Sequence, residues 1–311
     1  MYRPLKIVIL DENNTPLTFE KGIRLTMQRE LYTPFTALNA EFVSESSLNA
    51  SRICSIKLLW GEQTVFHGIP DKAAVTTSSG MNLITLSARS YTSLTANNEP
   101  EPGIKSDVDL NSLVTGCLTH PDITIETGTP VVNYIYVKPT STLWSAIIAY
   151  NLKARDRLPY IHGTNKIMST LRLSRRVDYT GVKLLSQGTG VNTMNMLSDV
   201  HMRIGDGTYD YNYNNPQSVK YSIKRSRYYE MDRQWLYDIN KGLVYKTALS
   251  NQKRNYSFFE YPSFADEQLF DRVSNTATQC DNKYINAVFL TADSKGIRTR
   301  ISCYNDDLGQ K

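Results

Sequence analysis

The stretch ICSIKLLWGEQTVFHGIPDKAAVTTSSGMNLITLSARS, residues 53–90, contains two hairpin patterns in direct succession. A tight glycine turn at 61–63 and a polar turn at 78–82 separate short apolar or alternating runs, which is typical of antiparallel strand pairs. The four predicted strands are Ile53–Trp60, Thr64–Ile69, Ala73–Thr77 and Leu83–Ser87. Strands at this spacing, with no helix between them, predict a barrel or sandwich, because a sheet must close or pack to protect its edges.

The residues before this stretch continue the same pattern. Leu5–Leu10 is an apolar run that a polar turn closes, and Ala37–Val43 alternates. In Gly22–Leu31, residues Ile23, Leu25, Met27 and Arg29 occupy every second position, so one face of this strand is expected to be buried. About seven strands therefore predict an N-terminal β-barrel over residues 1–98.

The composition changes at Ala96–Gly103, where two prolines and a glycine mark a domain boundary. Beyond it, Asp109 can cap a helix whose apolar residues recur at helical spacing through Leu118. Ser141 or Thr142 can start a second helix, which carries basic residues near its C-terminal end. Residues 99–175 are therefore predicted to form a small α+β insert domain.

The last third of the chain, residues 176–311, is again rich in strand patterns. A short helix is expected at Val191–Val200, strands within 209–229, and a helix and loop insertion at about 226–275. The chain then closes with a hairpin of Tyr284–Ala292 and Ile297–Tyr304. The predicted fold class is mainly β with α+β insertions, with two β-barrel domains separated by the small α+β domain.

Composition excludes several classes of protein. The 311 residues carry a formal net charge of only +5, which does not favour nucleic acid as a specific partner. No apolar run is long enough for a membrane helix, and no signal peptide is expected at the N-terminus, so no membrane insertion by the chain itself is predicted. Four widely spaced cysteines fit no metal motif and indicate free thiols in a reducing compartment. The 20 tyrosines favour strands and wet interfaces.

Catalytic and cofactor motifs are missing from the sequence. The four histidines, His67, His120, His162 and His201, have no metal-ligand spacing, and each is interpreted as a surface or satisfied polar residue. No serine lies in a nucleophile elbow, and Gly188-Thr189-Gly190 is interpreted as a turn rather than a phosphate loop. We therefore predict no enzyme activity, no catalytic residue, no cofactor and no metal site.

Tyr209, Tyr211 and Tyr213 form the most distinctive local pattern. In a strand they would share one face and could stack against sugars or bases, or pack against another subunit or insert. They are the one candidate interaction face that the sequence indicates.

The order of segments resembles one known family. Residues 65–103, with the strand ending Ala88-Arg89-Ser90-Tyr91-Thr92-Ser93-Leu94, resemble the end of the first domain in phage baseplate hub proteins of the late control protein D type. Leu110–Leu118 and Ser141–Ala149 resemble the two helices of that family's insert, and the final hairpin into ISCYNDD resembles the close of its second barrel. Ala88 stands where glycine is commoner in the family, and residues 226–275 match no part of it.

This resemblance implies a structural role without catalysis. Hub proteins of this type carry two tube-like barrel domains per chain, and three chains form a pseudo-sixfold ring with a channel. The implied partners are two further copies of the chain, the tail tube protein, the central spike protein, other baseplate proteins and the tape measure protein. The implied location is the baseplate of a virion or a phage-tail-like contractile particle, assembled in the cytoplasm of the host bacterium.

Two other functions remain open at this level. A carbohydrate-binding β-sandwich protein would use the face of Tyr209, Tyr211 and Tyr213. A tail-associated cell-wall hydrolase would need a catalytic constellation that the sequence does not display.

Overall fold

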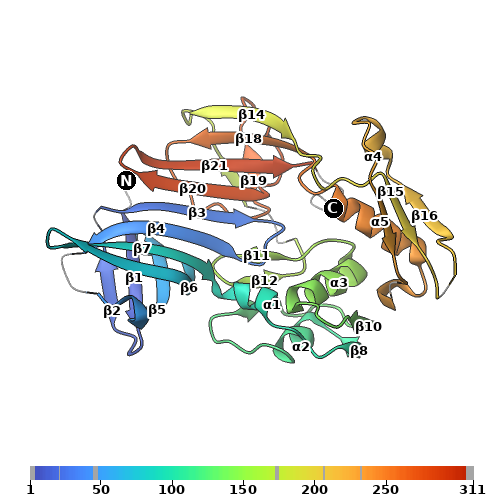
Figure 1. Ribbon diagram of the computed structural model, residues 1–311. Coiled ribbons are helices and arrows are strands. Elements are labelled where there is room, and N and C mark those ends of the chain that lie inside the picture. Colours follow the sequence, from blue (N-terminus) through green and yellow to red (C-terminus); the bar gives the residue numbers. More distant parts are fainter. Residues whose placement is uncertain are drawn as a thin grey trace.

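The computed structural model describes residues 4–20, 22–44, 48–171, 175–205, 207–231 and 233–305 (Figure 1). Strands dominate these residues, and the longest helices are α3 and α5. The strands are β1 (Leu5–Asp11), β2 (Pro16–Phe19), β3 (Arg24–Glu30), β4 (Thr36–Ser44), β5 (Ile53–Trp60), β6 (Gln63–Ser78), β7 (Met81–Ser90), β8 (Gly103–Val108), β9 (Thr124–Ile125), β10 (Val132–Val137), β11 (Tyr160–His162), β12 (Lys166–Met168), β13 (Arg176–Asp178), β14 (Ser186–Val191), β15 (Asp199–Met202), β16 (Tyr211–Asn214), β17 (Ser226–Tyr229), β18 (Asn255–Tyr261), β19 (Arg272–Ser274), β20 (Ala287–Asp293) and β21 (Gly296–Tyr304). The helices are α1 (Leu94–Asn97), α2 (Leu110–Thr115), α3 (Leu143–Arg155), α4 (Pro216–Val219) and α5 (Ile239–Ser250), with three short 3-10 turns, η1 (Ala50–Arg52), η2 (Tyr91–Ser93) and η3 (Arg233–Trp235).

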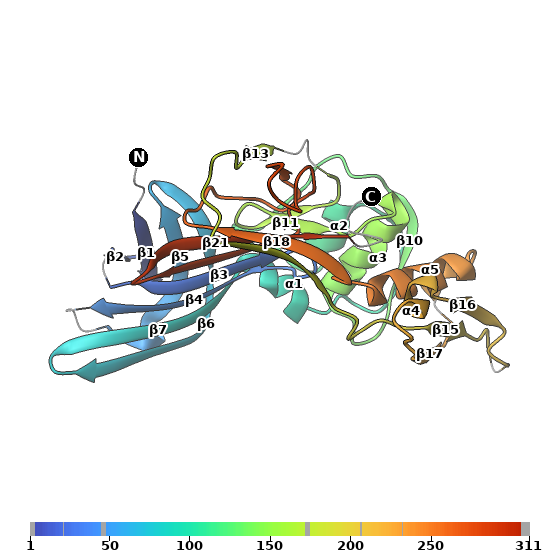
Figure 2. The same cartoon turned by 90° about the horizontal axis from the view of Figure 1, so that it is seen from above.

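One curled sheet of eleven strands contains both β-rich parts of the chain (Figures 1 and 2). Its order is β14-β18-β21-β20-β3-β4-β7-β6-β5-β1-β2. The two parts meet where β20 pairs antiparallel with β3, from Ala287 opposite Glu30 to Ala292 opposite Leu25. The mainly β class is confirmed. The finer expectation of two tube-like barrels stays a prediction, because the two parts share a single continuous sheet in this chain.

A common apolar core lies against one face of this sheet. Met27, Phe42 and Ile84 from the N-terminal part and Leu290 and Ile301 from the C-terminal part belong to the same buried cluster. Each occupies an alternate position in its strand, as the pleat requires. Full burial of such a side chain stabilises the fold by about 1.5–3 kcal/mol. The two β-rich parts are therefore joined by a shared core as well as by strand pairing.

The hairpins of residues 53–90 are confirmed, with one correction to their strands. The expected pair of strands Thr64–Ile69 and Ala73–Thr77 is one continuous strand, β6, which spans 63–78. Its register against β7 shifts between Pro70 and Lys72, so a bulge absorbs the extra residue. A bulge is one of the few places where a sheet accommodates a proline, which has no N–H to donate.

The insert between the two β-rich parts contains α2 and α3, and both expected caps are formed. The Asp109 carboxylate accepts a hydrogen bond from the Ser112 amide at 2.7 Å, and the Thr142 hydroxyl accepts one from the Ser145 amide at 3.2 Å. Both helices pack with β8 and β10 around their own apolar core. Figure 1 shows this insert below the C-terminal half of the curled sheet.

The last third of the chain differs from the predictions in two places. The predicted helix at Val191–Val200 is wrong: β14 ends at Val191 and β15 starts at Asp199, because Val200 is buried through pairing with β16 and β17. The helix and loop interpretation of 226–275 is also incomplete. It misses β18, which lies between β14 and β21 and buries alternate residues from Ser257 to Tyr261. The same period of two is visible in the sequence of β18, NYSFFEY.

Candidate functional site: a buried polar junction and exposed sheet edges

The three tyrosines of the predicted interaction face do not form one platform. Tyr211 and Tyr213 lie on β16 opposite Met202 and Val200, and directly paired residues point to the same side of a sheet. Val200 and Met202 are buried in a small core, and Tyr213 packs against it. The Tyr213 side chain therefore packs mainly against this small core, and the neighbouring Tyr211 side chain is partly exposed.

Tyr209 lies before β16 and on the other side of this small sheet. Its ring contacts Tyr228 edge to face at 5.0 Å and lies 5.6 Å from the guanidinium carbon of Arg203. Tyr228 in turn stacks on His201 at 4.6 Å. The expectation of a common face for Tyr209, Tyr211 and Tyr213 is wrong in geometry, and any role of these tyrosines in binding stays a prediction.

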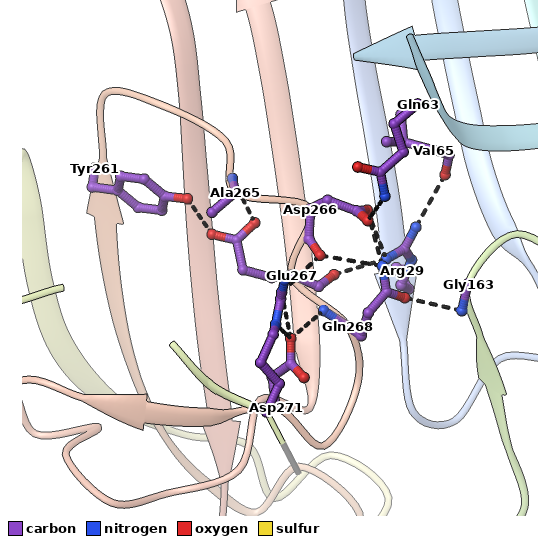
Figure 3. Close-up of polar contacts among 11 residues, drawn as sticks. Arg29, Gln63, Val65, Gly163, Tyr261, Ala265, Asp266, Glu267, Gln268 and Asp271 are labelled. Carbon is purple, nitrogen blue, oxygen red and sulfur yellow. Dashed lines mark hydrogen bonds and ion pairs between the residues drawn. The ribbon is translucent and has the colours of Figure 1, made fainter. Parts of the chain in front are cut away.

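Arg29 is the centre of a buried polar cluster that sequence reasoning did not single out as a site (Figure 3). It lies on β3 at the inward position that the alternation predicted, with only 1% of its surface exposed. Its guanidinium donates to the backbone carbonyls of Glu267 at 2.7 Å and Val65 at 3.0 Å, and lies 3.8 Å from the Asp266 carboxylate. Burial lowers the pKa of Arg29, and the nearby Asp266 and Glu267 oppose that shift.

The Glu267 side chain points away from Arg29, toward Tyr261, and is held by its own set of donors (Figure 3). The Tyr179 hydroxyl donates to it at 3.1 Å, the Ala265 amide donates at 3.3 Å, and the Tyr261 hydroxyl also donates. Burial raises the pKa of the Glu267 carboxyl, and the hydrogen bonds oppose that effect. Burial, followed by the charge of Glu267, raises the pKa of Tyr179 and of Tyr261 well above the usual range, so both phenols stay protonated as donors.

The same loop, residues 262–271, extends this cluster to the other segments of the chain. The Gln268 side-chain oxygen accepts a hydrogen bond from the Gly163 amide of the insert at 3.0 Å. Arg175 donates through Nη2 to the Asp271 carboxylate at 2.7 Å and to the Asp266 carbonyl at 2.9 Å. The cluster thus connects the N-terminal strands, the insert and the C-terminal strands, and its chemistry is that of a structural junction.

A second polar group places two of the histidines together. Ser55 Oγ lies 3.2 Å from His67 Nε2, and His67 Nδ1 lies 3.4 Å from the Asp122 carboxylate. His120 is also 3.9 Å from Asp122, and Tyr91 packs between the two imidazoles. His67 and His120 are far apart in the sequence, and β5, β6 and the insert loop bring them to one point, where both have polar partners.

The contacts from Ser55 to His67 and from His67 to Asp122 match those of a serine hydrolase triad, but their surroundings indicate a structural link. Ser55 is 7% exposed in the middle of β5, whereas a nucleophile must meet its substrate. The Ser55 hydroxyl also has an alternative acceptor, the Gly68 carbonyl at 3.4 Å. We interpret the group as a polar contact between the N-terminal strands and the insert.

The two outer strands of the large sheet are exposed. β14 and β2 stand at the ends of the strand order, so one backbone edge of each is available for pairing. Exposed apolar side chains lie on or next to these edges: Leu185, just before β14, is 45% exposed, Val191, at the end of β14, is 56% exposed, and Leu17 on β2 is 38% exposed. Exposed strand edges that carry apolar side chains are suited to assembly with another chain.

Two kinds of feature are absent from the described ranges. In the part of the chain that the structure describes, no three His, Cys, Asp or Glu side chains gather as a metal site would require. Within the same residues, no helix has both the length and the apolar content to cross a membrane.

Comparison with known proteins identifies the fold. No protein-family model matches the sequence, and no curated protein sequence matches it. The structure is similar to a tail protein of Neisseria meningitidis MC58, with a TM-score of 0.65, 13% identity, and coverage of 98% of both chains. It is similar to the 43 kDa tail protein of prophage MuSo2 of Shewanella oneidensis, with a TM-score of 0.64, 12% identity, and coverage of 96% of this chain and 98% of the other.

A third similar structure comes from a secretion machine. The E. coli c3393 protein, a component of the type VI secretion system, matches with a TM-score of 0.55 and 8% identity over 100% of this chain and 77% of its own. The chain described here therefore has a phage-tail-like fold over nearly its whole length.

Proposed function

We propose that this protein is the structural baseplate hub of a phage tail or phage-tail-like contractile particle. In this proposal three copies form a pseudo-sixfold ring that joins the tail tube to the central spike and leaves a channel. The observation that carries it is the likeness to phage tail proteins over at least 96% of the chain, because an inserted domain or a shared motif would match only part of it. The work of such a protein is assembly, and it needs no catalytic group.

The architecture supports a ring of this kind. Residues 1–98 and 176–311 would supply one tube-like domain each, with 99–175 as the insert, and six such domains would close around the channel. The β20–β3 pairing already joins the two domains of one chain into one sheet. Pairing between the β14 edge of one copy and the β2 edge of the next would extend the same sheet around the ring.

The proposed partners follow from this position. The tail tube protein and tape measure protein would meet one end of the ring, and the central spike and other baseplate proteins the other. A carbohydrate-binding role has no supporting observation, since Tyr209, Tyr211 and Tyr213 do not share a face.

Mass measurement by light scattering after size exclusion tests the ring. A species of about 106 kDa, three times the 35.3 kDa chain, is expected. The paired change Leu17→Asp with Leu185→Asp places charge at both sheet edges and should yield monomer with unchanged circular dichroism. Val219→Asp, at a residue that is 76% exposed on α4, is the matched control and should leave the mass unchanged.

A monomer that does not assemble with its tube or spike partner either would contradict the hub. A trimer that both the edge variant and the control retain would refute sheet extension as its basis.

A further inference from the structure

Residues 191–254 carry most of the net positive charge of the chain. They contain ten Lys and Arg against six Asp and Glu, which is +4 of the total +5. They include β15, β16, β17, α4 and α5, and form a lobe at one end of the molecule (Figure 1). Two of these cations, Lys241 and Lys253, form ion pairs with Asp156 and Glu30 outside the lobe, which reduces the excess of +4 to +2. The remaining excess gives the lobe a modest local positive field.

The lobe contains a small sheet with an uncovered edge strand. Its order is β16-β15-β17, so β17 is paired on one side only, in parallel with β15. Helix α5 packs against β16 and β15. A groove of about 690 Å³ lies between β17 and α5. The residues that line it include Met194, Arg225, Arg227, Tyr229, Lys246 and Leu249.

The three cationic side chains that line this groove make different contacts. Nη1 of Arg225 donates to the carbonyls of Thr193 at 2.8 Å and Met194 at 2.6 Å, which fixes the side chain at the rim. Arg227 is exposed, and no ion pair joins it to a carboxylate among the described residues. Lys246 on α5 lies 4.4 Å from the centre of the Tyr229 ring, so its ammonium is held at the groove wall. Positive charge therefore faces the groove from both of its sides.

The side chains between these charges are apolar or aromatic. Met194 is 72% exposed at the mouth, and Leu249 and Tyr229 line the wall. A free strand edge, apolar walls and two flanking cations are the features that bind an extended peptide by strand addition. A nucleic acid would also need aromatic rings that are free to stack on bases. The Tyr229 ring in the groove packs against the small core of the lobe and lies beneath Lys246, and the neighbouring Tyr228 ring is stacked on His201.

We propose that β17 and this groove form a docking site for an extended acidic segment of a partner protein. The segment adds a strand to the free edge of β17, and its alternate carboxylates lie against Arg227 and Lys246. The methylene groups of these carboxylate side chains contact Met194 and Leu249 on the same side of the added strand, because alternate residues of a strand share one face. The residues that line the groove belong to the lobe and include none of β14 or β2, so the proposal does not depend on the proposed ring.

A defined peptide tests the site on the full-length protein. The probe is a fluorescein-labelled peptide of about eight residues, alternating Glu with Val or Thr, with both ends blocked. Fluorescence anisotropy should show saturable binding that weakens as salt is raised. Arg227→Glu should raise the Kd by about tenfold or more, because it replaces an attraction with a repulsion. Lys220→Glu makes the same charge change in the same lobe outside the groove, and should alter the Kd by less than about twofold.

Two further measurements separate strand addition from charge alone, and a third checks that the variant is folded. A probe with N-methylated alternate amides keeps its charge but loses backbone donors, and should bind much more weakly. Hydrogen exchange of the complex should show new protection at 225–229. Circular dichroism of Arg227→Glu should match the unmodified protein, so that lost binding reports the site.

Four outcomes would overturn the proposal. The first is that the peptide shows no saturable binding at low salt, and the second is that Arg227→Glu and Lys220→Glu weaken its binding equally. The third is that the N-methylated probe binds as tightly as the unmethylated peptide. The fourth is that a single-stranded oligonucleotide of equal charge binds more tightly than the peptide at this groove. The last result would assign the groove to nucleic acid.

Discussion

Removal of the buried Arg29 guanidinium provides the strictest test of the polar junction. Arg29→Ala leaves the carbonyls of Glu267 and Val65 without their donor and leaves Asp266 without its closest buried cation. Hydrogen bonds that involve a charged group contribute about 1.5–3 kcal/mol each, so two of them give about 3–6 kcal/mol. Removal of one partner from a buried ionic cluster costs a similar amount, about 3–5 kcal/mol. The expected loss in the free energy of unfolding is therefore about 3–5 kcal/mol.

Urea unfolding followed by circular dichroism measures this loss. Arg24→Ala is the matched control on the same strand, because its side chain is 75% exposed and its ion pair with Glu41 is 3.8 Å long. Such a surface pair contributes about 0–1 kcal/mol. Arg29→Lys should lie between the two, since a single ammonium cannot reproduce the two-pronged donation to both carbonyls.

Hydrogen exchange locates the effect. Loss of Arg29 should expose the amides of 262–271 first, because that loop is held by the cluster. The reasoning is refuted if Arg29→Ala and Arg24→Ala differ by less than about 1 kcal/mol, which is the range of a surface substitution.

Three other predictions concern local features. Gly68→Ala should lower the free energy of unfolding by about 1–3 kcal/mol or more, because the new Cβ would lie 2.0 Å from the Arg89 carbonyl oxygen. The control in the same urea titration is Gly207→Ala, where the atom nearest to the new Cβ would be 3.8 Å away. Thr142→Ala should cost about 1 kcal/mol through loss of the α3 cap, whereas Thr142→Ser should cost little, as thermal unfolding of the three proteins can show. Burial lowers the pKa of His67 in the folded protein below its value in the unfolded chain. As the pH falls below about 6.5, the unfolded chain therefore binds this proton first, and the free energy of unfolding should fall. His67→Gln should reduce this dependence of stability on pH, and an unchanged dependence would assign it to other groups.

Local sequence patterns determined those elements of secondary structure that are stabilised by contacts between residues close together in the chain. The turns at 61–63 and 78–82, the caps Asp109 and Thr142, and the closing hairpin are all formed by contacts within a few residues. The inward position of Arg29 also followed from the alternation of its strand. Such features are readable because turn geometry, capping and the pleat act over short distances along the chain.

Contacts between distant residues were decided only by the tertiary structure. The pairing of β3 with β20 joins segments more than 250 residues apart, and the donation from Arg29 to Glu267 spans 238 residues. The same holds for the meeting of Ser55 and His67 with Asp122, and for the separation of Tyr209 from its two neighbours. No local rule specifies which strand edges meet, because that choice depends on the apolar area and polar groups that the whole chain buries together. The sequence by itself therefore determined the elements and their inward faces, and the packing of the complete chain decided how they assemble into one sheet, its polar junction and its open groove.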